Sequence, residues 1–541
     1  MTDIVKVIFS IQVDIATYYN ASGVILFNDP KDYAAEGVDK VYPDTWWLPP
    51  TGVQRGTVYA DMGDPLTPGY PSIKSAYRLK EESAIGLPSI PSHPIGYKDA
   101  EPLLRALGGP NVPAEWQGGL NFPYKVGPLQ TNRNIEMIVN NEYTRANAVN
   151  VIGYITGSVE PDRYVIVGGH RDAWAFGALD PNTGTAVAME VARVLSKFKS
   201  NGWRPRRTVI FVSWGAEEFG LIGSYEWVEQ YVKKLSGRAV AYLNLDTVVT
   251  GNYSLNMAAM PILNNLTIEA AKAVETANKA GKSLFEEWKE AHPDPSDKTK
   301  PKVDLLGAGS DQAPFYIFAG VPCIDFNYDF NTKAMGVSGY PVYHTGIETF
   351  KIFTTFIDPE FKYMQGLARY TLEILVQLSD SLIIPYDIIF YGDTVVKSEE
   401  SFRSSYGDLC KKHGVDLGNL KAAAQSFKKE CGNFMKRMEG INKNNPLEVR
   451  AYNDAMMSVE RSFLDGEGLP GRPAIYRHVL FAPSSADSYS GSAFPGLTDA
   501  LYQIEDDPDQ DGRWDVFKRH LATVTFILEA AADNLKDFHD I

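Results

Sequence analysis

The chain has 541 residues, of which 44% are hydrophobic and 22% are charged, and its formal net charge is −15 with a pI near 5.1. This length exceeds what one hydrophobic core supports, so we expect two or three domains of an ordinary globular protein. The acidic balance excludes nucleic acid as an expected partner, because phosphate binding requires a basic surface. The three cysteines show no metal-binding or disulfide spacing.

Residues 1–144 are rich in Pro, Gly and aromatic residues, with short apolar runs such as GVILF (23–27) between turn signals. This pattern predicts a mostly β region with long loops. The stretch IVKVIFSIQV (4–13) is interrupted by Lys6 and lacks a basic leader, so it is predicted to be a strand and not a signal peptide. No run reaches the roughly 18 apolar residues needed to cross a bilayer.

From residue 145 to 384, apolar strand-like runs alternate with helical patterns. The runs are YVIVGG (164–169), RTVIFVSW (207–214), AVAYLNL (239–245) and VPCIDF (321–326). Such alternation predicts an α/β domain around a largely parallel sheet. Beyond about residue 385 the strand signals fade, and long amphipathic stretches at 398–443, 446–464 and 511–537 predict a helical domain.

Metal-binding residue types occur where these strands end or in the loops that follow. In open α/β sheets, functional groups gather at the carboxyl ends of the strands. Six such residues are found there: His170, Asp180, Glu217, Glu218, Asp246 and His344. Each alone has a structural explanation, such as a cap or a favourable charge before a helix. Two His, two Asp and Glu218 supply ligands for two zinc ions about 3.5–4 Å apart, with one carboxylate bridging them, which leaves Glu217 free to take a proton from water.

At these residues the sequence resembles the glutamate carboxypeptidase II / transferrin receptor-like family of zinc peptidases. The matching segments include DPLTPGYPS (64–72), GLPSIPSHPIGY (86–97), EPDRYVIVGGHRDAWAFGALDP (160–181), WRPRRTVIFVSWGAEEFGLIGS (203–224) and SGYPVYH (338–344). The segment GAGSDQAPFYIFAG (307–320) looks more like the N-acetylated-alpha-linked acidic dipeptidase-like branch, whose members act as aminopeptidases. The resemblance covers almost the whole chain.

The resemblance assigns roles to the candidate metal ligands. It implies one zinc held by His170, Asp180 and Asp246, and a second held by Asp180 as the bridge, Glu218 and His344. A cis Asp180–Pro181 bond would supply the orientation that a bridging ligand needs. The resemblance also implies that Glu217 is the general base and that Tyr343 helps hold the reacting carbonyl. It implies a structural calcium site at Thr67, Tyr70, Glu226 and Glu229, and a substrate site that includes Ser310, Asp325, Asn327 and Tyr489. Glycosylation is implied at Asn252 and Asn265.

The resemblance also implies an architecture and a setting. We expect an apical protease-associated domain at 1–144, a zinc peptidase domain at 145–384 and a helical dimerisation domain at 385–541, acting as a homodimer. Family members begin with a cytoplasmic tail and a signal anchor. We therefore expect the apical domain to be truncated at its N-terminal side, and membrane attachment only through a segment absent from this chain. The expected location is extracellular or at the cell surface.

Specificity is where the sequence departs from glutamate carboxypeptidases, which hold a terminal glutamate with an arginine, an asparagine and a lysine. The matching positions are Phe9, Trp47 and Ser488, and an arginine pair nearby is replaced by Asp325 and Asn327. An unpaired substrate carboxylate would be costly there, whereas Asp325 could receive a substrate ammonium unless it pairs with a local lysine or backbone N–H. The favoured function is therefore a two-zinc aminopeptidase acting on peptides. A glutamate carboxypeptidase and a non-catalytic binding protein of the transferrin receptor kind are the alternatives.

Overall fold

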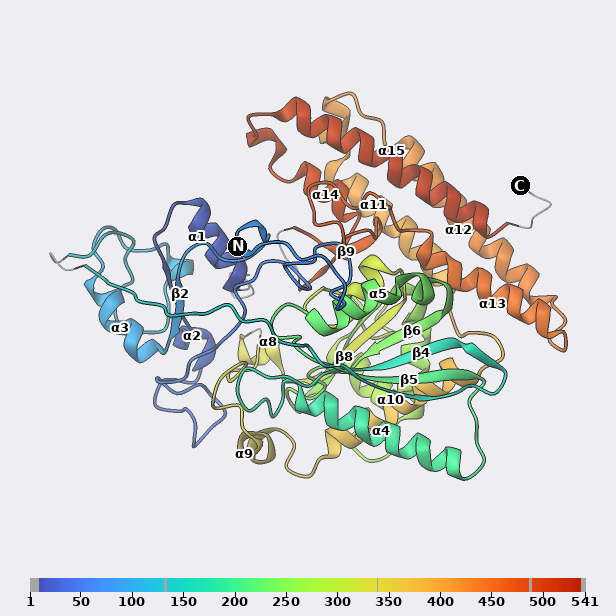
Figure 1. Cartoon of the computed structure of the whole chain (residues 1–541), viewed down its shortest axis with the longest axis horizontal. Helices are drawn as coiled ribbons and strands as arrows, with labels where there is room; N and C mark the ends of the chain where they lie inside the picture. The colour runs from blue at the N-terminus through green and yellow to red at the C-terminus, as the bar shows by residue number, and fades with distance from the viewer. Residues whose placement is uncertain (1–8, 131–133, 338, 486–488, 537–541) are drawn as a thin grey trace.

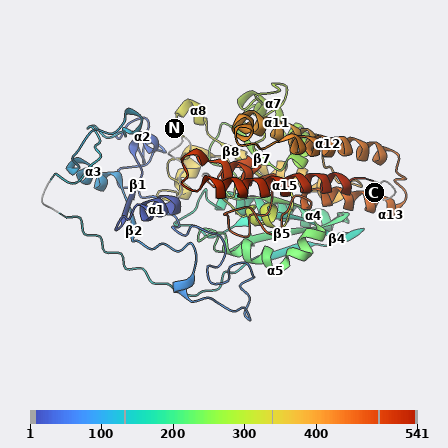
Figure 2. The same cartoon turned by 90° about the horizontal axis from the view of Figure 1, so that it is seen from above.

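The computed structural model describes residues 9–130, 134–337, 339–485 and 489–536. Figure 1 shows three regions: an N-terminal region rich in loops, a central sheet with helices on its faces, and a group of long C-terminal helices. Figure 2 shows the same regions from above. Short 3₁₀ or π turns lie between the main elements: η2 (Glu81–Ser83), η3 (Ala114–Trp116), η4 (Pro261–Leu263), η5 (Pro314–Phe318), η6 (Phe353–Ile357) and η7 (Ile504–Asp506).

The N-terminal region contains fewer strands than predicted. Within its described residues the strands are β1 (Val24–Phe27) and β2 (Ser92–Ile95), which pair in parallel. The helices are α1 (Phe9–Tyr18), α2 (Pro30–Tyr33) and α3 (Tyr97–Ala106). The prediction of a strand at 4–13 is wrong for the residues from Phe9 onward, which lie in α1, because a short apolar run does not separate a strand from a buried helix.

The central sheet has six strands in the order β3-β5-β4-β6-β8-β7. Their bounds are β3 (Val151–Ile155), β4 (Glu160–His170), β5 (Arg207–Trp214), β6 (Ala239–Asn244), β7 (Ser254–Ala259) and β8 (Cys323–Asp329). The four inner strands are parallel, and the edge strands β3 and β7 are antiparallel to their neighbours. The prediction of a mixed, largely parallel sheet is confirmed.

Helices cover both faces of the sheet. The chain moves from β4 outward to β5 and then back past β4 to β6, so right-handed crossovers place α4 (Asn182–Ser200) and α5 (Ile222–Arg238) on opposite faces. Helix α10 (Lys362–Asp380) packs beside α4. The inner strands are buried on both sides, which explains why they read as unbroken apolar runs. Four shorter helices complete this region: α6 (Asn264–Ala273), α7 (Leu284–Ala291), α8 (Thr332–Met335) and α9 (Phe350–Ile352).

The C-terminal region is helical, as predicted. It contains α11 (Ile388–Lys412), α12 (Gly418–Glu439), α13 (Pro446–Arg461), α14 (Pro495–Leu501) and α15 (Gln510–Asn534), with a short hairpin of β9 (Phe481–Pro483) and β10 (Gly491–Ala493). The stretch 398–443 is divided between α11 and α12. The break follows from Gly414, whose φ of 69° is the left-handed conformation that ends helices.

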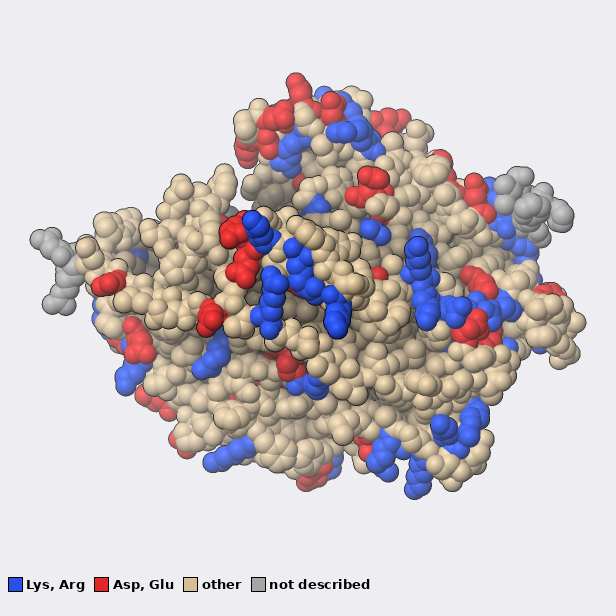
Figure 3. Space-filling view, viewed as in Figure 1, with Lys and Arg blue, Asp and Glu red and all other residues tan. Residues whose placement is uncertain are grey.

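Acidic and basic side chains are interspersed on the face shown in Figure 3, with a group of Lys and Arg near its middle. The net negative charge of the chain is therefore not concentrated in one acidic patch on this face. Among the helices of the described residues, none combines the length and the apolar character needed to span a membrane.

Candidate metal centre

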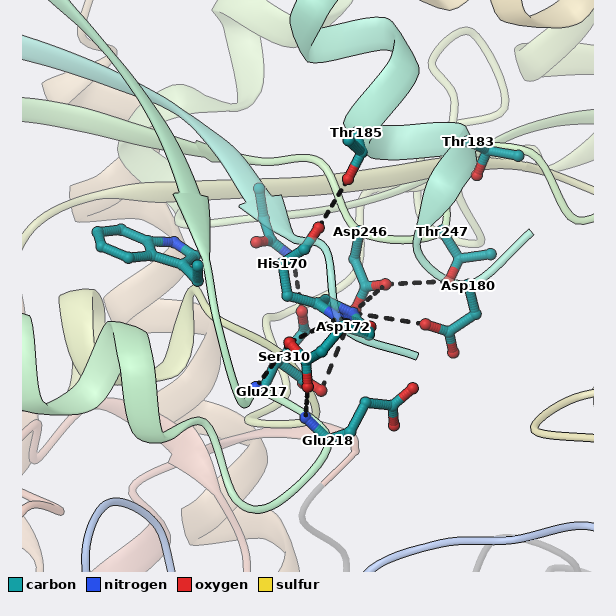
Figure 4. A network of polar contacts seen from close by, with 12 residues as sticks. His170, Asp172, Asp180, Thr183, Thr185, Glu217, Glu218, Asp246, Thr247 and Ser310 are labelled. Atoms are coloured by element: carbon teal, nitrogen blue, oxygen red, sulfur yellow. Dashed lines mark hydrogen bonds and ion pairs between the residues drawn. The ribbon is translucent and has the colours of Figure 1, made fainter. Parts of the chain in front are cut away.

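The six predicted residues meet at the carboxyl edge of the sheet. His170 is the last residue of β4, Glu217 and Glu218 lie in the turn between β5 and α5, and Asp246 follows β6. Asp180 comes from the loop between β4 and α4, and Figure 4 shows its carboxylate beside the imidazole of His170. His344 comes from the segment between α8 and α9.

Five of these side chains form two groups that share Asp180. His170, Asp180 and Asp246 make the first group, and Asp180, Glu218 and His344 make the second; in each group, atoms able to bind a metal lie within 4.8 Å of one another. His170 Nε2 is 3.4 Å from Asp180 Oδ1, whereas His344 Nε2 is 3.1 Å from Asp180 Oδ2. The two oxygens of one carboxylate therefore face different groups, as a bridging ligand requires.

The histidine contacts indicate which nitrogens are free. His170 Nδ1 lies 2.9 Å from the carbonyl of Asp172, and His344 Nδ1 lies 3.0 Å from the carbonyl of Arg55. Because a carbonyl only accepts hydrogen bonds, each Nδ1 carries hydrogen and donates it, leaving the Nε2 lone pair toward the carboxylates unless that nitrogen is also protonated. Each Nε2 lies 3.1–3.4 Å from an oxygen of Asp180, and both atoms carry lone pairs. They therefore require a cation between them, either a proton or a metal ion.

The spacing and chemistry of these atoms fit zinc. His170 Nε2 is 3.0 Å from Asp246 Oδ1, and His344 Nε2 is 3.2 Å from Glu218 Oε2. Ligand atoms at 2.0–2.1 Å around a tetrahedral zinc lie about 3.3 Å apart, and imidazole with carboxylate is a common zinc ligand set. Asp180 Oδ1 is buried and accepts no hydrogen bond, so it is open to a cation.

Electrostatics at the centre also favour bound cations. Burial opposes charge on both His170 and Asp180, but the carboxylates around His170 hold its pKa well above the ordinary value and the two histidines hold the pKa of Asp180 below it. Burial, and then the charge of Asp180, raise the pKa of Glu218 to about 10. A cation between these groups would relieve the repulsion. The Asp180–Pro181 bond is cis, which confirms that prediction.

Glu217 lies beside the two groups without belonging to either. Its Oε2 is 3.9 Å from His170 Nε2, and burial raises the pKa of Glu217 well above its ordinary value. The turn that carries it is unusual, because Ala216 has a φ of 61° in the left-handed region that non-glycine residues rarely adopt. Strained backbone of this kind is concentrated at functional sites.

Asp172 holds this strained turn, and it was not among the residues predicted from sequence. Its Oδ1 accepts from the backbone N–H of Glu217 at 3.1 Å and its Oδ2 from that of Glu218 at 3.2 Å. The same residue accepts from His170 through its carbonyl. Asp172 therefore ties the end of β4 to the turn after β5. Its place two residues after a strand-end histidine is the one sequence signal that points to it.

Tyr343 lies against the centre. Its ring stacks on His344, with ring centroids 3.6 Å apart and planes 22° from parallel. Burial, followed by the neighbouring Tyr489, raises the pKa of Tyr343 well above its ordinary value, so the hydroxyl keeps its proton and can donate a hydrogen bond. Tyr489 is 43% exposed and lies close over Gly309, where an added Cβ would meet its ring at 2.5 Å.

Asn244 links two of the predicted substrate residues. Its amide donates to Asp325 Oδ1 at 3.1 Å and to Ser310 Oγ at 3.0 Å. Asp325 is therefore paired with neutral N–H groups, from the Asn244 amide and the Phe326 backbone, and not with a lysine. Burial raises the pKa of Asp325 to about 6. Asn327 instead donates to Thr250 Oγ1 at 3.3 Å.

The positions that match the glutamate clamp offer no cation in the described residues. Trp47 is 1% exposed and belongs to the hydrophobic core. Phe9 is the first residue of α1, and an added Cβ at Gly56 would meet its ring at 3.1 Å. Ser488 lies outside the described residues.

The predicted calcium residues lie where residues 64–72 meet α5. Glu226 accepts from the backbone N–H groups of Asp64 at 2.7 Å and of Ser72 at 2.5 Å. Thr67 Oγ1 and both carboxylate oxygens of Glu229 are buried and have no hydrogen-bond partner. Burial raises the pKa of Glu226 to about 7 and that of Glu229 to about 8. Unpartnered hard oxygens of this kind suit a calcium ion.

Two ranges of the chain match known protein families. Residues 150–355 match the model of peptidase family M28, and residues 415–536 match the transferrin receptor-like dimerisation domain. The chain is 37% identical over 540 residues to the aminopeptidase NAALADL1 of Rattus norvegicus, covering 97% of this chain and 72% of that protein. It is also 37% identical over 551 residues to a glutamate carboxypeptidase 2 homolog of Caenorhabditis briggsae, covering 96% and 70%.

Proposed function

Since the chain belongs to the M28 family of zinc exopeptidases, we propose that it acts with two zinc ions as an aminopeptidase. The observation that carries the two-ion proposal is the carboxylate of Asp180, whose two oxygens face His170 and His344 respectively. In this proposal His170, Asp180 and Asp246 hold one ion, and Asp180, Glu218 and His344 hold the other.

The chain's own residues would divide the chemistry as follows. Zinc, when bound, supplies positive charge that polarises the peptide carbonyl and acidifies water. Glu217 takes a proton from the attacking water as its oxygen bonds to the carbonyl carbon, and gives that proton to the leaving nitrogen when the C–N bond breaks. The protonated hydroxyl of Tyr343 donates to the carbonyl oxygen, where negative charge develops. Asp172 fixes the backbone of Glu217 for both proton transfers.

The choice of aminopeptidase rests on charge at the substrate site. Asp325 accepts from the amide of Asn244, which also donates to Ser310 and lies two residues before Asp246, a ligand residue of the first group. A carboxylate there can accept the free ammonium of a peptide's first residue, in a charge-assisted bond worth about 1.5–3 kcal/mol. The described clamp positions hold no cation for a terminal carboxylate. Similarity to both aminopeptidases and glutamate carboxypeptidases keeps the carboxypeptidase as the second candidate.

A free-amine peptide and its N-acetylated form should therefore differ sharply as substrates of the zinc-loaded protein. We expect cleavage of the first and not of the second, because acetylation removes the ammonium that Asp325 would bind. Asp325→Asn should lower kcat/KM for free-amine peptides by about tenfold or more, since roughly 1.4 kcal/mol of transition-state binding is lost. Product analysis by mass spectrometry checks both results.

Asp304→Asn is the matched control, because Asp304 is half exposed and pairs with Lys302, so its replacement should leave the preference for free-amine peptides unchanged. Efficient release of C-terminal glutamate from the N-acetylated peptide would overturn the aminopeptidase proposal and support the carboxypeptidase. Absence of hydrolysis with both peptides, in protein that holds zinc, would favour a binding protein.

We also propose a calcium ion held by Thr67, Tyr70, Glu226 and Glu229. Calcium at 100 times its Kd should stabilise the folded chain by about 2.7 kcal/mol and raise Tm. Glu229→Gln should remove most of that rise, since Gln lacks the negative charge that calcium prefers. Scanning calorimetry with saturating zinc measures the effect, and Glu190→Gln on the exposed side of α4 is the control. An equal calcium response in both variants would exclude Glu229 as a ligand.

The remaining proposals concern assembly and setting. We propose domains at 1–144, 145–384 and 385–541, and a homodimer formed through the transferrin receptor-like domain. The side chains of Asn252 and Asn265 are exposed, which supports glycosylation at both and an extracellular or cell-surface location. Any membrane attachment would involve a segment other than the helices described here.

A further inference from the structure

One buried carboxylate, that of Glu348, contacts the two loops that carry Asp180 and His344, two of the three ligand residues of the second group. Its Oε1 accepts from the backbone N–H of Leu179 at 3.0 Å and of Asp180 at 2.7 Å. Its Oε2 accepts from the backbone N–H of His344 at 3.2 Å and from the hydroxyl of Tyr340 at 3.2 Å. Glu348 is 2% exposed and lies outside both groups of ligand atoms, so its carboxylate serves to hold these four donors.

The backbone at His344 needs such support. Its φ of 57° lies in the left-handed region, which is costly for a residue with a Cβ and persists only where neighbouring contacts impose it. Two contacts do so: Glu348 accepts the N–H of His344, and the N–H of Arg55 donates to its carbonyl at 3.0 Å. The Arg55 carbonyl also receives the Nδ1 hydrogen of the ring. The position of the imidazole is thus set from both sides.

We propose that Glu348 is a positioning residue that sets Asp180 and His344 at the distance that the second zinc requires. The inference rests on the proposed two-zinc function. A carboxylate suits this task because each of its two oxygens accepts, so one side chain can hold both loops at once. Glutamine has the same length but one accepting oxygen. Its NH₂ would face either the N–H of His344 or those of Leu179 and Asp180, donor against donor.

Glu348→Gln should therefore weaken zinc at the second group while the protein stays folded. We expect the chelator concentration that removes the more weakly held zinc to fall by about 10–100-fold, the range seen when residues supporting metal ligands are changed. The zinc of the first group shares Asp180 but not His344, so its affinity should fall much less. Excess zinc should restore kcat, because no reacting group is lost. Zinc per chain is measured by mass spectrometry across a chelator series, and Co²⁺ absorption reports the ligand geometry.

Glu399→Gln is the matched control, because Glu399 is equally buried but pairs with Arg403 on α11. It should leave both zinc affinities unchanged. Unchanged zinc release in folded Glu348→Gln would overturn the proposal, as would equal weakening of both ions. If that variant does not fold, Tyr340→Phe, which removes one donor to Glu348, should shift release of the same zinc by a few-fold; no shift would overturn it. A wild-type chain that binds fewer than two zinc ions would instead refute the two-zinc function itself.

Discussion

Glu217→Gln is expected to lower kcat by about 10²–10⁴-fold, the usual contribution of a general base, while the chain keeps its full zinc content. Glutamine has the size of glutamate but cannot take a proton from water at neutral pH. Glu217 contributes no atom to either group of ligands, so its replacement leaves every proposed metal contact in place. Steady-state kinetics on a free-amine peptide, together with zinc analysis of the same sample, measures the effect.

The neighbouring Glu218→Gln separates the two roles. Glu218 Oε2 faces His344 in the second group, so this variant should lose zinc and activity together. Adding zinc should recover part of its activity but none of that lost in Glu217→Gln. If instead Glu217→Gln lost zinc and Glu218→Gln kept it, the base and the ligand would have to be exchanged.

Asp180→Ala should have the largest effect on metal content. Asp180 belongs to both groups, so its removal should bring zinc below one ion per chain and activity to background. Asp246→Ala is the comparison, because Asp246 belongs to the first group alone and its loss should release one ion. Both variants are measured after dialysis against a weak chelator, with circular dichroism to show that they fold. Equal zinc loss in the two would contradict a bridging role for Asp180.

The sheet and the residues at its carboxyl edge could be predicted because both leave a local signal. A parallel strand buried on two faces is a nearly unbroken apolar run, and the residue after it must lie at the functional edge. His170 and Asp246 were found in this way. Asp180 and His344 lie on loops, so their prediction as ligands depends on the family resemblance as much as on the pattern of strand ends.

The residues that support the centre could not be predicted, because their partners are distant backbone groups. The carboxylate of Glu348 accepts from Asp180, which is 168 positions away along the chain. Asp172 accepts from Glu217, which is 45 positions away. A backbone N–H has no identity in the sequence, so no pattern marks the side chain that will bind it. The N-terminal region could not be predicted for another reason: the short apolar run that forms α1 fits a helix and a strand equally well.

The sharing of Asp180 between the two groups has a consequence for the order in which the centre is assembled during synthesis. The last residue of the first group is Asp246, whereas the second group waits for His344. A ribosome adds the intervening stretch of about 100 residues in roughly 5–20 s. During that interval only the ligand residues of the first group are complete. In the proposed two-zinc function a nascent chain would therefore bind its two metals one after the other, the second only after the loop that carries His344 and Glu348 has been made.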